Sequence, residues 1–513
     1  MNAVELKLFA SRIAAICDEM GVVLRRAAFS PNIKDRLDFS CALFGRDGQL
    51  IGQAAHIPVH LGSMAFAMGG LVRRRAWHPA DMLVVNDPFL GGTHLPDVTV
   101  IAPVFIHNTL IGFVANRAHH ANIGCETPGS MPMSQQLEEE GIVIPPTLLF
   151  SSGQLQQSCL ALLQMPAGRL DGDLAAQVGA NQLGVQRLCE LVNGIGRASF
   201  NAGMQELDAY ADRIMEKLID ALSPGVYSFE DFLDGDGFGN SDIPLSLILT
   251  VEAQSVELNF AGSSDMVQGN LNCPESVVAA AVYYCFRCLL PDESPSCSGL
   301  FRRLKIKTKS RSILNAERPA AVAAGNVETS MRLVDLIFGA LAQILPEQIP
   351  AASQGTMNNI ALGRIDPVSG ARWDYYETVA GGLGAGPHAD GLSCAQSHMT
   401  NTLNTPVEVL EMSYPLRVIR YAERQGSGGA GKSRGGNGVI KQYEFLESAQ
   451  LTLLTERRRF APWGLSGGQD GAKGENLLNG QSLPGKCSLT VNAGDRLEIR
   501  TPGGGGWGLS EPR

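Results

Sequence analysis

The sequence predicts a multidomain α+β (mixed α/β) fold. It would have a β-rich N-terminal part that carries candidate metal ligands, a central helical block, and a glycine-rich, β-rich C-terminal part. Three observations predict it. Helical and strand-like hydrophobic periods alternate along the chain. A length of 513 residues exceeds what a single hydrophobic core usually supports. The 58 glycines exceed average usage, which indicates many tight turns or close approaches between backbones.

The chain opens with a predicted amphipathic helix over about residues 4–28. Its apolar residues recur every three or four positions, as on the buried face of a helix. They are Leu6, Phe9, Ile13, Ile16, Met20 and Val23. From 40 to 150 the pattern changes to short β-rich runs such as MLVVN and VTVIAPVFI, interrupted by Gly, Pro and His. A second helical block follows over about 172–222, and Pro224 and Gly225 end it.

The same hydrophobic periods predict the strands and helices of the middle and last parts of the chain. Two strand-like runs, LSLILTVEA and VELNFAG, precede two helical runs, SVVAAAVYYCFRCLL and MRLVDLIFGALAQIL. The remainder is glycine-rich and strand-like. These changes predict four regions: 1–150, the N-terminal helix and β-rich metal-site region; 151–223, helical; 224–349, α/β; and 350–513, glycine-rich and β-rich.

The composition limits the classes of partner and compartment. A net charge of −10 argues against nucleic acid or an anionic membrane surface as a partner. The first run of residues mixes charges into its apolar positions, unlike a signal peptide, and no apolar run is long enough for a transmembrane helix. Eleven cysteines scattered over a long chain suit a reducing cytosol. We therefore expect a cytoplasmic protein.

The stretch GSGGAGKS, residues 426–433, matches the phosphate-binding pattern G-x-x-x-x-G-K-[ST]. A working phosphate loop lies between a buried strand and a helix whose N-terminus faces the phosphates. Here residues 435–438 are GGNG, and each glycine would cost a helix about 1 kcal/mol relative to alanine. We therefore interpret the stretch as a glycine-rich turn with a surface lysine, and we expect no nucleotide site in this chain.

Histidines are concentrated in one block of the chain, since seven of the nine lie between residues 56 and 120. In NDPFLGGTHLPD, His94 and Asp97 are three apart after a flexible Gly-Gly, so one turn of chain can aim an imidazole and a carboxylate at one point. His119 and His120 end a strand-like run. Because strand neighbours face opposite ways, at most one of them should face a shared site. The spacing is equally consistent with a catalytic divalent metal site and with histidines that hydrogen-bond within the core.

Other candidate groups are weaker. Cys285 and Cys288 form a single C-x-x-C in an apolar helical run, without the second pair that a zinc knuckle needs, so we expect them to pack in the core. His388, Asp390 and His398 could line a pocket in the C-terminal half or lie in turns, and we favour turns.

Several motifs, spread over essentially the whole chain, resemble those of the hydantoinase B family. They are SPNIKDRLDFSCALF (30–44), HIPVHLGSM (56–64), NDPFLGGTHLPDVTVIAPVF (86–105), NRAHHANIG (116–124), PGSMP (128–132), AAGNVETS (323–330), TNTLNTPVEVLE (400–411), SGGAGKSRGG (427–436) and TPGGGGWG (501–508). The resemblance implies that SGGAGKSRGG is that family's own glycine-rich motif, whereas the nucleotide is handled by a partner A subunit.

Resemblance to this family also implies a divalent metal site. Asp38 of the DRLDFS segment would join His94 and Asp97 of THLPD and His119, the first histidine of the HH pair. Two imidazoles and two carboxylates suit zinc and manganese about equally. His120 is the expected catalytic residue and, if it points away from the metal, would orient a ligand or shuttle a proton.

The activity that the resemblance implies is ATP-dependent hydrolysis of a cyclic amide, of the 5-oxoprolinase or N-methylhydantoinase type. The chain would be the metal-containing B subunit of a hetero-oligomer, expected to be A2B2. The A subunit would use ATP to activate the carbonyl of a hydantoin, 5-oxoproline or similar lactam. The B subunit would then perform the attack with metal-activated water. Two alternatives stay open: a subunit of an ATP-dependent ketone carboxylase, and a non-catalytic scaffold that completes the partner's site.

Overall fold

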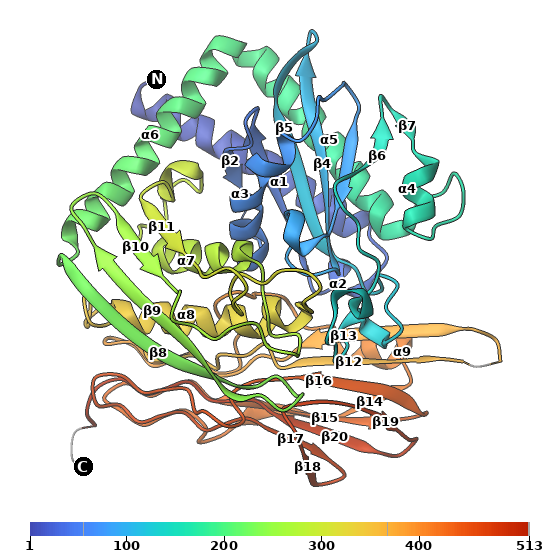
Figure 1. Ribbon diagram of the computed structural model, residues 1–513, viewed down its shortest axis with the longest axis vertical. Coiled ribbons are helices and arrows are strands. Elements are labelled where there is room, and N and C mark those ends of the chain that lie inside the picture. Colours follow the sequence, from blue (N-terminus) through green and yellow to red (C-terminus); the bar gives the residue numbers. More distant parts are fainter. Residues whose placement is uncertain (55, 367, 511–513) are drawn as a thin grey trace.

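The computed structural model describes residues 1–54, 56–366 and 368–510. In this part of the chain, helices and four mostly antiparallel sheets form an α+β structure, which confirms the predicted fold class (Figure 1). The α-helices are α1 Ala3–Ala27, α2 Pro31–Lys34, α3 Pro58–Val72, α4 Gln157–Leu162, α5 Gly172–Ile195, α6 Arg197–Ala221, α7 Glu275–Cys288, α8 Ser330–Leu341 and α9 Val407–Ser413. Within the described residues, each helix is too short or too polar to cross a bilayer.

The predicted long helices are confirmed, with one break that the sequence analysis did not place. Helix α1 covers the predicted span 4–28, and Asn2 and Glu5 close its first turn in a reciprocal capping box. The predicted block 172–222 is two helices, α5 and α6. They separate at Gly196, whose φ of +82° is strained for any residue with a side chain.

The N-terminal β-rich region forms an antiparallel sheet with the strand order β2–β1–β5–β4–β3–β6–β7. Its strands are β1 Phe39–Gly45, β2 Leu50–Gln53, β3 Met82–Val85, β4 Asp97–Ile106, β5 Thr109–His119, β6 Thr147–Ser151 and β7 Gln154–Leu155. Helices α1 and α5 cover one face and α3 covers the other. Alternate residues of the central strands therefore enter two different apolar clusters, and both faces of these strands are buried.

The middle region adds a second sheet, in the order β11–β10–β9–β8, beside the apolar helices α7 and α8. Its strands are β8 Gly225–Gly235, β9 Ser241–Val251, β10 Val256–Asn259 and β11 Leu304–Lys307. Helix α7 packs closely on α3, because a Cβ at Gly62 would lie only 2.5 Å from the Cα of Ala280. This contact ties the middle region to the N-terminal sheet.

The glycine-rich last third forms two further sheets at the bottom of Figure 1, ordered β13–β12–β16–β19 and β14–β15–β20–β17–β18. Their strands are β12 Asn359–Ile365, β13 Arg372–Thr378, β14 Leu416–Arg424, β15 Gly438–Phe445, β16 Ala449–Leu454, β17 Glu475–Leu478, β18 Gln481–Leu483, β19 Lys486–Val491 and β20 Arg496–Arg500. Apolar residues of both sheets share a separate core. The predicted domain boundaries near 150, 223 and 349 stay predictions.

Two glycine-rich segments, 426–438 and 501–508, pack against each other at backbone contact distance. Gly429 donates its N–H to the carbonyl of Gly504 at 2.9 Å. A Cβ at Gly504 would lie 2.0 Å from the carbonyl oxygen of Leu383, far inside normal contact distance. The concentration of glycine in this region therefore reflects layers of backbone that leave no space for side chains.

Candidate metal centre

Asp97 is the centre of a buried cluster on the α3 face of the N-terminal sheet. Its Oδ1 lies 3.1 Å from His94 Nε2 and 3.2 Å from His119 Nδ1. Its Oδ2 accepts a hydrogen bond from Thr93 Oγ1 at 2.8 Å and lies 3.2 Å from His60 Nε2. The Asp97 and His94 side chains are fully buried and His119 is 2% exposed, so the group is shielded from bulk water.

The local sequence explains how these side chains meet. Strands β4 and β5 pair antiparallel in a register that sets Asp97 directly opposite His119. His94 comes from the loop that leads into β4. There Gly91 has a φ of +119°, and a Cβ at Gly92 would lie 2.1 Å from the carbonyl oxygen of Asn86. The Gly-Gly therefore permits a tight turn that no other residue pair would allow.

The residues of this cluster fit a divalent metal ion. His94, Asp97 and His119 each offer a ligand atom, and these atoms all lie within 4.8 Å of one another. His119 Nε2 is buried and, among the described residues, has no hydrogen-bond partner, whereas His94 Nε2 faces Asp97 Oδ1. His94 Nδ1 lies 3.2 Å from the carbonyl oxygen of Ala323, which holds the ring with Nε2 turned towards Asp97. Imidazole and carboxylate donors are those that zinc and manganese take.

The electrostatics of the cluster also suit a cation. Burial alone would raise the pKa of the Asp97 carboxyl, but His60, His94 and hydrogen bonds from His119 and His60 hold it well below its ordinary value. Burial lowers the pKa of His119 despite the nearby carboxylates Asp97 and Asp38. These directions favour the ionised form of Asp97 and the neutral form of His119, which metal ligands need. Burial alone would lower the pKa of His94, but Asp97 in turn raises it.

The structure places the other predicted ligand and one unpredicted residue at the edge of the cluster. Asp38, 7% exposed, precedes β1, and its backbone carbonyl accepts the His119 N–H at 3.0 Å. Its Oδ1 lies 3.8 Å from His60 Nε2, so His60 lies close to both Asp38 and Asp97. We did not single out His60 from the sequence, although it belongs to the histidine-rich block and follows Pro58, the first residue of α3. The assignment of Asp38, His94, Asp97 and His119 as ligands stays a prediction.

His120 faces away from this cluster. Its Nε2 lies 2.9 Å from Gln177 Oε1 on α5, whereas His119 faces the α3 side of the sheet. Gln177 in turn donates to the carbonyl of Val98 on β4 at 2.8 Å. The expectation that at most one of the two histidines faces a shared site is confirmed. The catalytic role assigned to His120 stays a prediction.

A second layer of buried groups holds the cluster in place. Glu140 Oε1 accepts the N–H groups of Val322 and Ala323, both at 2.9 Å, and so fixes the segment whose carbonyl contacts His94. Burial raises the pKa of Glu140 to about 7. From the C-terminal region, the Tyr376 ring on β13 stacks on His119 with centroids 4.8 Å apart. Parts of the chain that are far apart in sequence therefore support one cluster.

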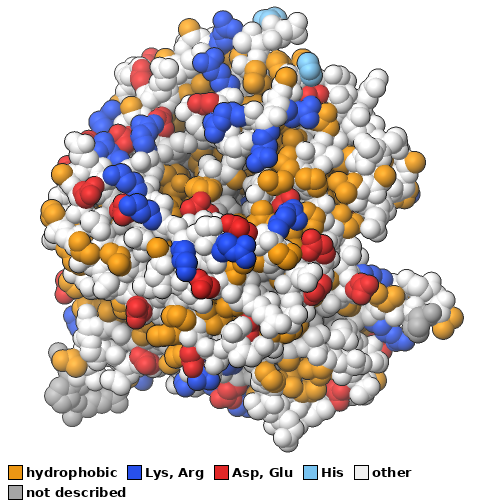
Figure 2. Space-filling view, viewed as in Figure 1, with side chains coloured by type: hydrophobic (Ala, Val, Ile, Leu, Met, Phe, Trp, Pro, Cys, Tyr) orange, Lys and Arg blue, Asp and Glu red, His pale blue; other side chains and the backbone are white. Residues whose placement is uncertain are grey.

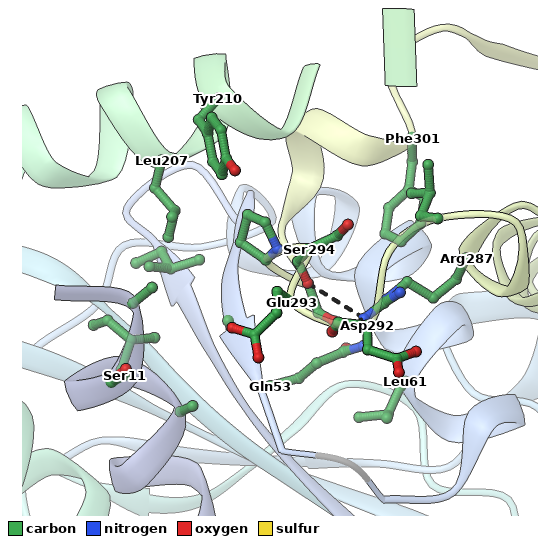
Figure 3. Close-up of a pocket in the computed structure, with 18 of the residues that line it drawn as sticks. Ser11, Gln53, Leu61, Leu207, Tyr210, Arg287, Asp292, Glu293, Ser294 and Phe301 are labelled. Atoms are coloured by element: carbon green, nitrogen blue, oxygen red, sulfur yellow. Dashed lines mark hydrogen bonds between the residues drawn. The ribbon is translucent and has the colours of Figure 1, made fainter. Parts of the chain in front are cut away.

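A large cavity of about 1260 Å³ lies on the other side of α3 (Figure 3). Leu61 and Gly62 of α3 line it, together with residues of α1, α6 and α7, whereas His60 projects from the opposite face of the helix towards Asp97. Figure 2 shows hydrophobic side chains within a hollow of this face of the molecule, with Lys and Arg around it.

Cys288 lines the cavity and is exposed, so the expectation that it packs in the core is wrong; Cys285 is buried as expected.

The phosphate-loop pattern is not followed by a helix, as expected from its glycines. After residues 426–433 the next element is strand β15, Gly438–Phe445. The Lys432 ammonium lies over the Trp507 ring, 5.9 Å from its centroid, rather than over an open backbone cradle. Asp390 Oδ1 accepts the Arg434 N–H at 2.7 Å, so this side chain joins two segments 44 positions apart and not the ends of a local turn.

Substitution of Lys432 by alanine is therefore expected to leave the affinity of the chain for ATP unchanged. The lysine is bound to an aromatic ring and no helix N-terminus is available for phosphates in this part of the described chain. The check is isothermal titration of ATP into the isolated chain and into Lys432→Ala protein. Micromolar binding that the substitution abolishes would contradict the turn interpretation.

A model of the family described as hydantoinase B/oxoprolinase matches residues 2–510. The chain is 39% identical to 5-oxoprolinase 1 of Arabidopsis thaliana over 99% of its own length, but it spans only 42% of that protein. It is 29% identical to the putative B subunit of a D-/L-hydantoinase from a Pseudomonas species, covering 99% of this chain and 90% of that one. The structure superposes on the ATP-dependent caprolactamase of Pseudomonas jessenii with a TM-score of 0.91 and 27% identity, covering 99% and 91% of the two chains.

Proposed function

The chain belongs to the hydantoinase B/oxoprolinase family, and from that premise we propose that it is the metal-containing B subunit of an ATP-dependent cyclic-amide hydrolase. The observation that carries the proposal is the buried group of His94, Asp97 and His119, whose ligand atoms lie within 4.8 Å of one another. The names of the three similar proteins support it, because 5-oxoproline, hydantoins and caprolactam are all cyclic amides.

The proposed roles of His94, Asp97 and His119 are supported by their geometry, and that of Asp38 by the family resemblance. His94, Asp97 and His119 would hold one zinc or manganese ion, with Asp38 as the fourth ligand. A divalent ion there would polarise a carbonyl oxygen or lower the pKa of a water molecule. His60 and Thr93 keep the Asp97 carboxylate turned towards the two histidines. His120 would orient a ligand or shuttle a proton from the opposite face of the sheet, where its Nε2 contacts Gln177 of α5.

A second component is needed because an ordinary cyclic amide is a poor electrophile. Resonance along the C–N bond stabilises the amide, so attack becomes easy only after the carbonyl is activated. The described residues show no helix behind the lysine of the phosphate-loop pattern. We therefore assign ATP-dependent activation to a partner A subunit, in an A2B2 assembly. In 5-oxoprolinase 1, which this chain covers only to 42%, we assign that task to the remaining length.

The test is to assay the chain alone and with its A-type partner on hydantoin, 5-oxoproline and caprolactam. We expect no ring opening by the isolated chain, even with ATP, because it cannot activate the amide. With the partner, ring opening should appear and ADP should form in step with it. The measurement is product formation by chromatography alongside ADP release.

Three results would contradict the proposal in different ways. Ring opening by this chain alone without ATP would mean that it is a self-sufficient metallohydrolase. Carboxylation of a ketone in the presence of ATP and bicarbonate, without lactam hydrolysis, would support the carboxylase alternative. Full activity of an assembly that contains Asp97→Ala protein would support the non-catalytic scaffold.

A further inference from the structure

A buried amide lies against the same carboxylate that joins the two histidines. Asn326 is 2% exposed, and its Nδ2 donates to Asp97 Oδ2 at 3.2 Å. Because only the NH2 end of an amide can donate to a carboxylate, this contact decides which way the amide is turned. The other end, Oδ1, is buried and has no hydrogen-bond partner within residues 1–54, 56–366 and 368–510. A hydrogen-bond acceptor beside the candidate metal centre is therefore available.

The backbone around Asn326 is firmly held. The residue lies in a π-helical turn, Gly325–Thr329, that continues into α8, and such turns occur frequently at functional sites. Gly325 donates its N–H to the carbonyl of Asn270 at 2.9 Å. Thr329 Oγ1 donates to the carbonyl of Leu271 at 2.6 Å. The amide is thus placed by the fold before any ligand arrives, as a preorganised recognition group requires.

We propose that Asn326 Oδ1 accepts the ring N–H of the cyclic amide and so selects substrates that carry a hydrogen on that nitrogen. The inference rests on the proposed function. The substrate feature that the site would recognise is the N–H of the ring. A lactam or a hydantoin presents an N–H directly beside the reacting carbonyl, whereas a ketone or a lactone has no donor there. A site with a buried acceptor rejects an analogue that leaves the acceptor unpaired.

The experiment compares 5-oxoproline with its oxygen analogue, 5-oxotetrahydrofuran-2-carboxylate, in the complete assembly with ATP. In Asn326→Ala protein, kcat/KM for the lactam should fall about tenfold more than kcat/KM for the lactone. Thr93→Val is the matched control, because it also removes one hydrogen bond to Asp97 Oδ2 but leaves the Asn326 acceptor in place. Thr93→Val should lower kcat/KM for the lactam and for the lactone by the same factor. Elemental analysis of both variants accounts for any shared loss of metal.

A second measurement does not depend on how the variants fold. With wild-type protein, methylation of the ring nitrogen, as in 1-methyl-5-oxoproline, removes the donor and should lower kcat/KM by at least about tenfold. Asn326→Ala protein should discriminate less between the two compounds.

Equal losses on lactam and lactone, or equal turnover of the methylated compound by wild-type protein, would overturn the inference and leave Asn326 as a support for Asp97. That result is distinguishable from failure of the proposed function, in which the wild-type assembly opens no lactam at all.

Discussion

Under the proposed function, Asp97→Ala protein is expected to bind no divalent ion and, together with its A-type partner, to show no cyclic-amide hydrolysis. Asp97 contacts His94, His119 and His60 and so joins the three imidazoles of the cluster. Its removal would take away a proposed carboxylate ligand and leave the imidazoles without the charge that aligns them. Metal content, measured by elemental analysis, should fall from about one ion per chain to a background level. His94→Ala protein should behave in the same way.

The control for this prediction is an exposed histidine of the same sheet. His107 lies in the turn between β4 and β5 with a φ of +47°, a conformation that asparagine tolerates. His107→Asn protein should therefore keep its metal and its activity. If Asp97→Ala and His94→Ala proteins keep the same metal content as His107→Asn protein, the cluster is not the metal site.

The largest expected loss of stability follows from breaking a buried ion pair between β13 and β15. Lys441 Nζ lies 2.7 Å from both carboxylate oxygens of Glu377, and the two side chains are 1% and 0% exposed. Tyr443 and Asn404 donate to the same carboxylate. Lys441→Met leaves a buried charge without its partner, which should lower the free energy of unfolding by about 3–5 kcal/mol. Chemical denaturation measures the change.

An exposed pair provides the comparison. Arg459 and Asp242 lie 2.6 Å apart, with side chains 57% and 40% exposed, and Arg459→Met should lower the free energy of unfolding by less than about 1 kcal/mol. A loss in Lys441→Met protein no larger than that of Arg459→Met protein would show that the buried pair contributes nothing.

The same pair determines how stability depends on pH. Burial alone would raise the pKa of Glu377, but Lys441 and hydrogen bonds from Lys441, Tyr443 and Asn404 hold it below its ordinary value. The stabilisation is therefore present above the pKa of an unfolded glutamate and is lost as the pH falls through the lower pKa of the folded state. In Lys441→Met protein the burial of Glu377 remains but the ammonium is gone, so its carboxyl takes up a proton more readily. The difference in free energy of unfolding between wild-type and Lys441→Met protein should therefore be largest near neutral pH and should shrink as the pH falls.

Features that depend on local periodicity could be predicted from the sequence. The regular spacing of apolar residues in α1 predicted its span within one residue at each end. The break at Gly196 was missed because the residues on both sides of it keep a helical pattern. Helix α3 was missed because it lies within a region whose other runs are strands, and His60 was missed with it.

The candidate site was predicted only as far as short-range spacing reaches. The separation of three residues between His94 and Asp97 pointed to a shared site. The pairing of Asp97 with His119 depends on the register of two strands, which no local pattern reveals. Asn326 reaches Asp97 across 229 positions of sequence. Such contacts result from tertiary packing, and only the family resemblance could indicate that these segments belong together.

The glycine layers of the C-terminal region have a consequence for the order of folding during synthesis. Residues 501–508 lie between backbone segments that leave the ribosome earlier: Gly505 donates to the carbonyl of Ala352 and Gly506 to that of Gln469. The carbonyl groups of these earlier segments lack their hydrogen-bond donors until residues 501–508 have been translated. The region around them therefore closes late, through contacts distant in sequence, and a nascent chain stalled before residue 501 would expose unpaired backbone to its neighbours.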